Sequence, residues 1–155
     1  PAEDKKYTYA ELLLEVCKFS HALYSLGAKK GDRICIYMQM IPELTIAMLA
    51  CARIGAVHSI VFGAFSSDSL KDRINDSKCK YLITQDTGVR GTKTNIPMKS
   101  NADSACDNCP SIKNIIVVER TGYQVKTAIL MAKLGLNLES ANKWLESAHI
   151  GLLFP

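Results

Sequence analysis

The stretch "KKGDRICIYMQMIPELTIAMLACARIGAVHSIVFG", residues 29–63, decides the fold. A Gly31-Asp32 turn precedes a short apolar run rich in strand-forming residues, which is typical of a strand buried on both faces. Pro42 then suits the first turn of a helix. The residues of this helix are almost all apolar, so we expect other parts of the protein to pack against it on nearly every side. A second apolar strand ends before Gly63. Because a helix separates the two strands, the order predicts a parallel pair.

The sequence on either side repeats this alternation of helices and strands. Residues 7–27, "YTYAELLLEVCKFSHALYSLG", open with Thr8 and Glu11 at the spacing of a capping box and end at Gly27, which favours a helix stop. The polar segment "SSDSLKDRINDSKC" predicts a helix capped by Ser66. "KYLIT" and "NIIVV" predict a third and a fourth strand. We therefore expect an α/β fold with a mainly parallel sheet and helices on both faces.

The composition is that of a soluble globular domain. The chain has 155 residues, of which 48% are hydrophobic and 22% charged. The net charge of +4 is spread without a polybasic run, so we expect neither nucleic acid nor a membrane surface as a partner. The longest apolar stretch is too short to span a bilayer, and no signal peptide is recognisable. Since the chain begins at Pro1, we expect a piece of a longer protein.

The six cysteines favour free thiols in a reducing compartment, which predicts a cytoplasmic location. Four of them stand singly among apolar neighbours, as buried free cysteines do: Cys17, Cys35, Cys51 and Cys79. Cys106 and Cys109 form a C-x-x-C pair, but a zinc ribbon needs a second pair, and the three histidines lack ligand spacing. We predict two incidental thiols and no metal site.

Two loops lie where ligands bind in open α/β sheets, beyond the carboxyl ends of the strands. In "FGAFSS", residues 62–67, Gly63 permits a tight turn and Ser66 opens a helix whose N-terminus favours anions. In "QDTGVRGTKTNIP", residues 85–97, Arg90 offers a planar fork of donors and Lys93 a point charge, which together suit a phosphate. Neither loop carries a dinucleotide fingerprint or a Walker motif. An ordinary turn and a solvated charged loop remain the alternatives.

The sequence resembles the N-terminal domain of AMP-forming acetyl-CoA synthetase, in the adenylate-forming ligase superfamily. The resemblance covers about residues 7–122. It includes the run "MIPELTIAMLACARIGAVHSIVFG", which is characteristic of the acetate and propionate branch, and continues through "DNCPSIKNIIVVERTG". It implies a complete enzyme that joins acetate to CoA with Mg-ATP, through acetyl-AMP and pyrophosphate. It also implies that the ATP loop and the catalytic lysine lie downstream, so that this segment needs the remainder of the chain.

The resemblance further implies a part of the CoA site. It aligns the turn Phe62, Gly63 and Ala64 with the family turn at the adenine end of CoA, and it aligns "RGTK" with the family loop that meets the nucleotide phosphates: Arg90, Gly91, Thr92 and Lys93. Ala64 stands where the family usually has glycine, which adds a methyl group to the turn. Lys93 stands where arginine is common, which keeps the charge but loses the bidentate hydrogen bonding of a guanidinium. No catalytic residue is expected in the segment.

The resemblance ends near Gly122, which divides the chain into a ligase-like segment, residues 1–122, and a tail, residues 123–155. The tail predicts two helices, at residues 127–134 and 140–148, with Trp144 on the apolar side of the second. Its "KLGLN" and "AHIGLLFP" are similar to anthranilate phosphoribosyltransferases, which leaves a chimeric origin open. A non-catalytic α/β module that binds CoA or another nucleotide is the second functional alternative.

Overall fold

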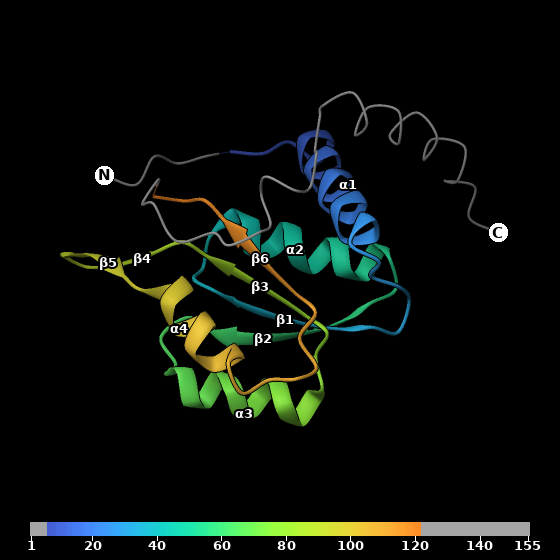
Figure 1. The fold of residues 1–155 in the computed structure, drawn as a ribbon. Helices are drawn as coiled ribbons and strands as arrows, with labels where there is room; N and C mark the ends of the chain where they lie inside the picture. The colour runs from blue at the N-terminus through green and yellow to red at the C-terminus, as the bar shows by residue number, and fades with distance from the viewer. Residues whose placement is uncertain (1–5, 122–155) are drawn as a thin grey trace.

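The protein is built around a four-stranded parallel sheet with the strand order β2-β1-β3-β6 (Figure 1). The structure, a computed structural model, describes residues 6–121. The sheet strands are β1 (Arg33–Met38), β2 (Val57–Phe62), β3 (Tyr81–Gln85) and β6 (Asn114–Val118). The helices are α1 (Tyr9–Ser25), α2 (Pro42–Arg53), α3 (Ser67–Ser77) and α4 (Met98–Cys106). The predicted α/β class with a mainly parallel sheet is confirmed.

Helices cover both faces of the sheet, because alternate residues of each strand point to opposite sides. Ile34 and Ile36 of β1 pack into a core with α1 and α2, whereas Cys35 and Tyr37 pack into a second core with α3 and α4. Figure 1 shows the first pair of helices above the sheet and the second pair below it. The expectation that α2 is covered on nearly every side is not met by residues 6–121, since Leu49 stays 42% exposed.

The helix ends follow the predicted capping signals. The hydroxyl of Thr8 accepts a hydrogen bond from the backbone N–H of Glu11 at 3.2 Å, and the Glu11 carboxylate accepts one from the backbone N–H of Thr8 at 2.7 Å. Gly27 follows α1 with a φ of 85°, the left-handed conformation expected of a helix stop. Ser66 caps α3 by accepting a hydrogen bond from the N–H of Ser69 at 3.3 Å.

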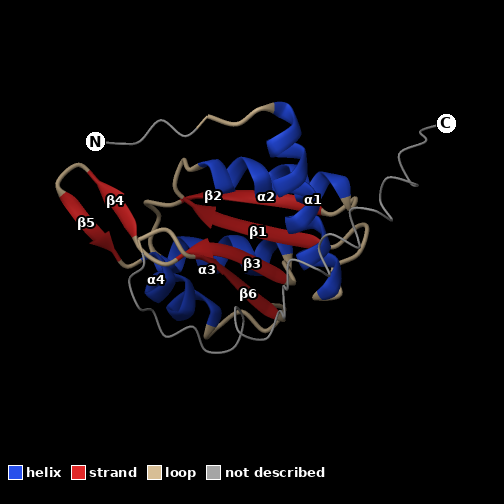
Figure 2. Ribbon diagram, turned by 90° about the horizontal axis from the view of Figure 1, so that it is seen from above, coloured by secondary structure: helices blue, strands red, loops and turns tan. Residues whose placement is uncertain are grey.

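A short hairpin extends beyond the end of the sheet where a loop was predicted. Residues 85–97 contain β4 (Gly88–Arg90) and β5 (Lys93–Ile96), which pair antiparallel with Arg90 opposite Lys93. Gly91 lies in the connecting turn with a φ of 58°, which an L-residue with a side chain rarely adopts. Figure 2 shows the hairpin projecting past the arrowheads of the strands. The two basic residues of this segment, Arg90 and Lys93, therefore lie opposite each other on paired strands.

The predictions for the tail fall outside the described residues. This applies to the helices at residues 127–134 and 140–148, to Trp144 and to the position of the boundary at Gly122. Within residues 6–121, no helix combines the length and the apolar character that crossing a bilayer requires.

Candidate functional site

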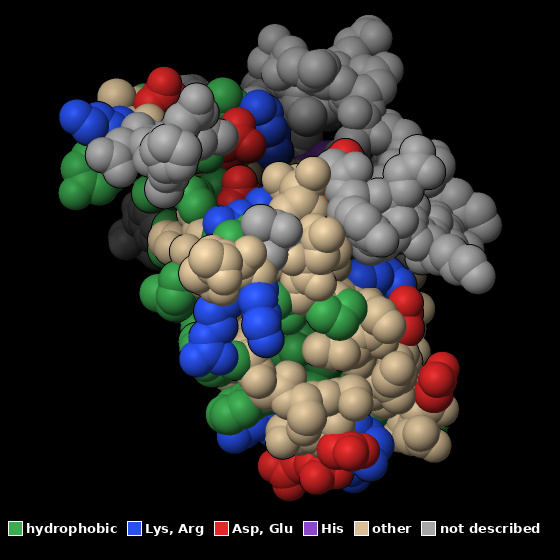
Figure 3. Space-filling view, turned by 90° about the vertical axis from the view of Figure 1, so that its left-hand side faces the viewer, with side chains coloured by type: hydrophobic (Ala, Val, Ile, Leu, Met, Phe, Trp, Pro, Cys, Tyr) green, Lys and Arg blue, Asp and Glu red, His purple; other side chains and the backbone are tan. Residues whose placement is uncertain are grey.

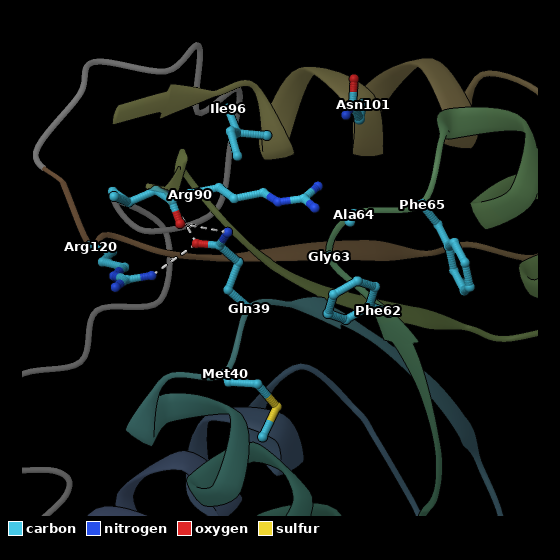
Figure 4. A pocket seen from close by; sticks show the side chains of 11 residues that line it. Gln39, Met40, Phe62, Gly63, Ala64, Phe65, Arg90, Ile96, Asn101 and Arg120 are labelled. Atoms are coloured by element: carbon cyan, nitrogen blue, oxygen red, sulfur yellow. Dashed lines mark hydrogen bonds between the residues drawn. The ribbon is translucent and has the colours of Figure 1, made fainter. Parts of the chain in front are cut away.

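A pocket of about 410 Å³ lies at the carboxyl ends of the strands (Figure 4). Strand β1 continues into α2 on one face of the sheet, whereas its neighbours β2 and β3 continue toward α3 and α4 on the other face. Connections that diverge in this way open a crevice between adjacent strands, which is where open α/β sheets bind ligands. The pocket is lined by Gln39, Met40, Phe62, Gly63, Ala64, Phe65, Val89, Arg90, Ile96, Asn101 and Arg120.

The pocket brings together the two loops that the sequence singled out, residues 62–67 and 85–97, whose nearest ends are 18 positions apart along the chain. Four of the seven predicted CoA-site residues line it: Phe62, Gly63, Ala64 and Arg90. The other three do not line it and lie in the hairpin turn or on β5: Gly91, Thr92 and Lys93. The predicted basic pair is thus split, with Arg90 in the pocket and Lys93 beside it on the neighbouring strand.

The turn after β2 forms the apolar side of the pocket. The Tyr37 hydroxyl donates a hydrogen bond to the carbonyl oxygen of Phe65 at 2.8 Å, which ties the turn to β1. The rings of Phe62 and Phe65 meet edge to face, with centroids 6.1 Å apart. Phe62 remains 59% exposed, so its ring is available to a ligand.

Gly63 is required here by close packing. A Cβ atom at this position would lie 3.1 Å from the backbone carbon and oxygen of Met38 and 3.0 Å from the Met98 methyl group. The φ angle of Gly63 is not in the left-handed region, and neither is that of Ala64. Ala64 is therefore accommodated without backbone strain, and its exposed methyl group borders the pocket.

The hairpin is anchored to the sheet by the side chain of Gln39, the first residue after β1. The Oε1 atom of Gln39 accepts a hydrogen bond from the N–H of Val89 at 2.9 Å, and its Nε2 atom donates one to the Val89 carbonyl at 3.1 Å. Val89 immediately precedes Arg90, so this pair of bonds sets the backbone from which the Arg90 side chain extends over the pocket in Figure 4.

Arg120 supplies a second guanidinium that the sequence analysis missed. It follows β6, and its Nη1 atom donates a hydrogen bond to Gln39 Oε1 at 3.0 Å. The stretch "VVERTG" could have predicted this position. It places an arginine two residues beyond the fourth parallel strand, and such a residue lies at the same edge of the sheet as the two predicted loops. Figure 3 shows this face of the molecule, where Lys and Arg side chains lie beside hydrophobic ones.

A buried carboxylate braces the segment that carries Arg120. Asp86 accepts hydrogen bonds from the N–H of Thr87 at 2.7 Å and from the N–H and hydroxyl of Thr121, both at 2.9 Å. Burial works to raise the pKa of Asp86, but the hydrogen bonds from Thr121 and Thr87 outweigh it and hold the pKa below its ordinary value. Asp86 therefore stays ionised and fixes Thr121, the neighbour of Arg120.

The lining of the pocket supplies groups that can bind an anion. Its lining combines two arginines, two side-chain amides and two aromatic rings, which suits an anion attached to a flat apolar group. Within residues 6–121, no group of three or more potential metal ligands comes together, and all six cysteines of the chain are in this range and are free. Cys106 and Cys109 lie at the end of α4 and just beyond it, away from the residues that line the pocket.

Comparison with known proteins gives matches over most of the chain. Residues 2–143 match the family model described as AMP-binding enzyme. Acetyl-coenzyme A synthetase from Gamma-proteobacterium EBAC31A08 is 58% identical over 125 residues, which cover 81% of this chain and 19% of the relative. Acetyl-coenzyme A synthetase from Rubrobacter xylanophilus is likewise 58% identical, with the same shares covered. That of Nostoc linckia is 56% identical over 125 residues, which cover 81% of this chain and 37% of the relative.

These matches confirm the resemblance that the sequence analysis identified from residues 7–122. They also show that the chain spans only about a fifth of the length of the first two relatives, 19% in each case. The pocket therefore consists of side chains from a segment that corresponds to a small part of those longer proteins.

Proposed function

Because the chain belongs to the AMP-binding enzyme family, we propose that it is the N-terminal segment of an AMP-forming acetate-CoA ligase and forms part of the CoA-binding site. The complete enzyme would join acetate and Mg-ATP into acetyl-AMP and pyrophosphate, and the CoA thiol would then displace AMP to give acetyl-CoA. The ATP loop and the catalytic lysine would lie in the remainder of the ligase chain.

One observation carries this proposal: Arg90 and Arg120 reach the same crevice as the aromatic turn after β2. The nucleotide of CoA combines a flat adenine with charged phosphates, so an aromatic side chain beside two guanidinium groups matches its chemistry. Arg90 would meet the 3′-phosphate region, with Phe62, Gly63 and Ala64 at the adenine end. Lys93 would add charge from β5, with Gly91 and Thr92 shaping the turn between them.

The proposal is tested by replacing Arg90 with alanine in the complete ligase chain and comparing CoA with 3′-dephospho-CoA. Loss of a charge-assisted contact worth about 1.5–3 kcal/mol should raise the KM for CoA by roughly 10- to 100-fold. The KM for 3′-dephospho-CoA should change little, since the phosphate is absent. Arg53→Ala, which removes the same charge from the end of α2, serves as the control. Equal losses for both ligands would refute the proposed phosphate contact.

A second experiment separates the ligase segment from a free-standing binding module. Pyrophosphate release that depends on acetate and ATP is measured for the 155-residue chain and for the complete ligase. We expect release from the complete ligase and none from the 155 residues alone, because the pocket described here contains binding groups only. Acetate-dependent release by the 155 residues would contradict this assignment.

A further inference from the structure

The side chain of Gln39 connects the two segments that carry the pocket arginines. Its Oε1 atom accepts hydrogen bonds from the N–H of Val89 at 2.9 Å and from Nη1 of Arg120 at 3.0 Å, and its Nε2 atom donates to the Val89 carbonyl at 3.1 Å. The dashed lines in Figure 4 show the amide between these partners. A second link between the two segments lies at their bases, where the hydroxyls of Thr87 and Thr121 are 2.6 Å apart, and Gln39 is the contact that reaches Val89 and Arg120 themselves.

The orientation of the amide follows from its partners. An amide oxygen has two lone pairs, and its two shortest hydrogen bonds come from Val89 N–H and Arg120, with a longer one from Gln85 Nε2 at 3.5 Å. The Val89 carbonyl needs a donor, which only the nitrogen of the amide supplies. Gln85 holds the base of the side chain, because its Oε1 atom accepts a hydrogen bond from the backbone N–H of Gln39 at 2.9 Å. Both ends of Gln39 are therefore fixed.

Gly88 leaves room for this amide. A Cβ atom at position 88 would have its three nearest neighbours in the Gln39 amide group, at 2.9 Å from Cδ and 3.0 Å from each of Nε2 and Oε1. The φ angle of Gly88 is not in the left-handed region, so alanine is compatible with the backbone there. A single methyl group at position 88 would thus displace the amide of Gln39 without removing it.

We propose that Gln39 is the positioning residue of the anion pocket, holding the strand that presents Arg90 and the guanidinium of Arg120 at a fixed separation. Both arginines are exposed, and long exposed side chains lose conformational entropy when they are ordered around a ligand. Arg120 uses one donor on Gln39 and keeps others of its five for an anion. The inference rests on the proposed function only for the identity of that anion, the phosphates of CoA.

The first test is a double-mutant cycle in the complete ligase, with Gln39→Met, Gly88→Ala and the double variant. Each single change should raise the KM for CoA by about tenfold, the equivalent of one lost hydrogen bond, with kcat and the KM for acetate unchanged. The double variant should be no worse than Gln39→Met, because the methyl group at position 88 then displaces a side chain that makes no hydrogen bonds to Val89 or Arg120. Additive losses, or an unchanged KM for CoA in Gln39→Met, would overturn the inference.

The second test needs no ligand. Hydrogen exchange at the Val89 amide should be about tenfold faster in Gln39→Met and in Gly88→Ala, since the amide oxygen that accepts its bond is removed or displaced. The Arg53→Ala control should leave this rate unchanged. An unaltered Val89 rate in both variants would contradict the role of Gln39. An Arg90→Ala ligase with an unchanged KM for CoA would overturn the proposed function instead, and the exchange rates alone would then decide the inference.

Discussion

At the scale of the residue, Asp86 shows how one buried charge organises the edge of the sheet. Its side chain is 1% exposed, and it accepts three hydrogen bonds from Thr87 and Thr121. Its backbone carbonyl also accepts a hydrogen bond from the N–H of Lys99 at 3.0 Å, in the first turn of α4. Asp86 thereby joins the end of β3 to α4 and to the segment after β6.

Asp86→Asn should lower stability by about 1.5–3 kcal/mol at neutral pH, because hydrogen bonds to a charged acceptor are lost. The pKa of Asp86 is lowered in the folded protein, so its stabilisation is complete above the unfolded value of about 3.9 and is lost as the pH falls through the folded pKa. Thermal scans should therefore separate the variant from the unmutated chain at pH 7, with the gap closing as the pH falls below the unfolded pKa of about 3.9 and through the lowered folded pKa. A gap independent of pH, or one reproduced by the exposed control Asp76→Asn, would contradict this account.

Gly63→Ala should destabilise the protein by about 1–3 kcal/mol, because its Cβ atom would press on the backbone of Met38. The matched control is Ala64→Gly, which restores a glycine at the next, exposed position and should cost less than about 1 kcal/mol. The midpoints of thermal unfolding of the two variants are compared. Similar midpoints would show that position 63 tolerates a side chain.

Sequence reasoning pointed to pocket residues that are marked by a local pattern and missed those whose placement in the pocket depends on neighbours in space. Phe62 ends a recognisable strand, and Gly63 and Arg90 come after one, so the rule for open sheets pointed to these positions. Gln39 and Arg120 also follow strands, but their contact depends on the order of strands in the sheet. Since 81 positions separate them, no local pattern reveals it.

At the scale of the element, the sheet strands and three of the four helices in residues 6–121 were predictable because each carries its own signal, whereas α4 begins without a side-chain cap. The capping box of Thr8 and Glu11 and the Ser66 cap mark helix starts, and short apolar runs mark the strands. The hairpin β4–β5 was missed because its strands have three and four residues and contain few apolar side chains. Strands this short are stabilised by their surroundings, here the Gln39 amide that pairs with Val89.

Gly91 provides a test of the hairpin as an element. Its φ of 58° is costly for most residues, so Gly91→Ala should destabilise the turn by about 1–2 kcal/mol. Gly91→Asn should cost less, because asparagine visits the left-handed region more readily. Limited proteolysis within residues 88–96 of the complete ligase should be faster in the alanine variant than in the asparagine variant. Equal rates would show that the conformation of Gly91 does not limit the order of the hairpin.

At the scale of the whole molecule, the described sheet has two open edges, β2 and β6, and the β2 edge is the one that exposes large apolar side chains. In the sheet formed by residues 6–121, β2 is an edge strand, and three of its apolar side chains are exposed: Val57 at 58%, Ile60 at 44% and Phe62 at 59%. Unpaired edges with exposed apolar side chains promote association. Because the chain spans about a fifth of its relatives, 19% in the first of them, we expect this edge to be covered in the complete ligase.

The 155-residue chain alone should therefore self-associate, and Ile60→Lys should reduce the association by placing a charge on the open edge. Sedimentation velocity at several concentrations measures the effect. Tyr24→Lys on α1, which adds the same charge at an exposed aromatic position, is the control and should leave association largely unchanged. A monomeric 155-residue chain at all concentrations would show that the open edge does not drive association.

The central claim is that the crevice between Arg90 and the turn after β2 receives the nucleotide of CoA. The most direct measurement is an experimental structure of the complete ligase with CoA bound. The account predicts a CoA phosphate within hydrogen-bonding distance of the Arg90 guanidinium and the adenine against the turn at Phe62, Gly63 and Ala64. A nucleotide bound elsewhere, with this crevice empty or filled by another part of the chain, would contradict it.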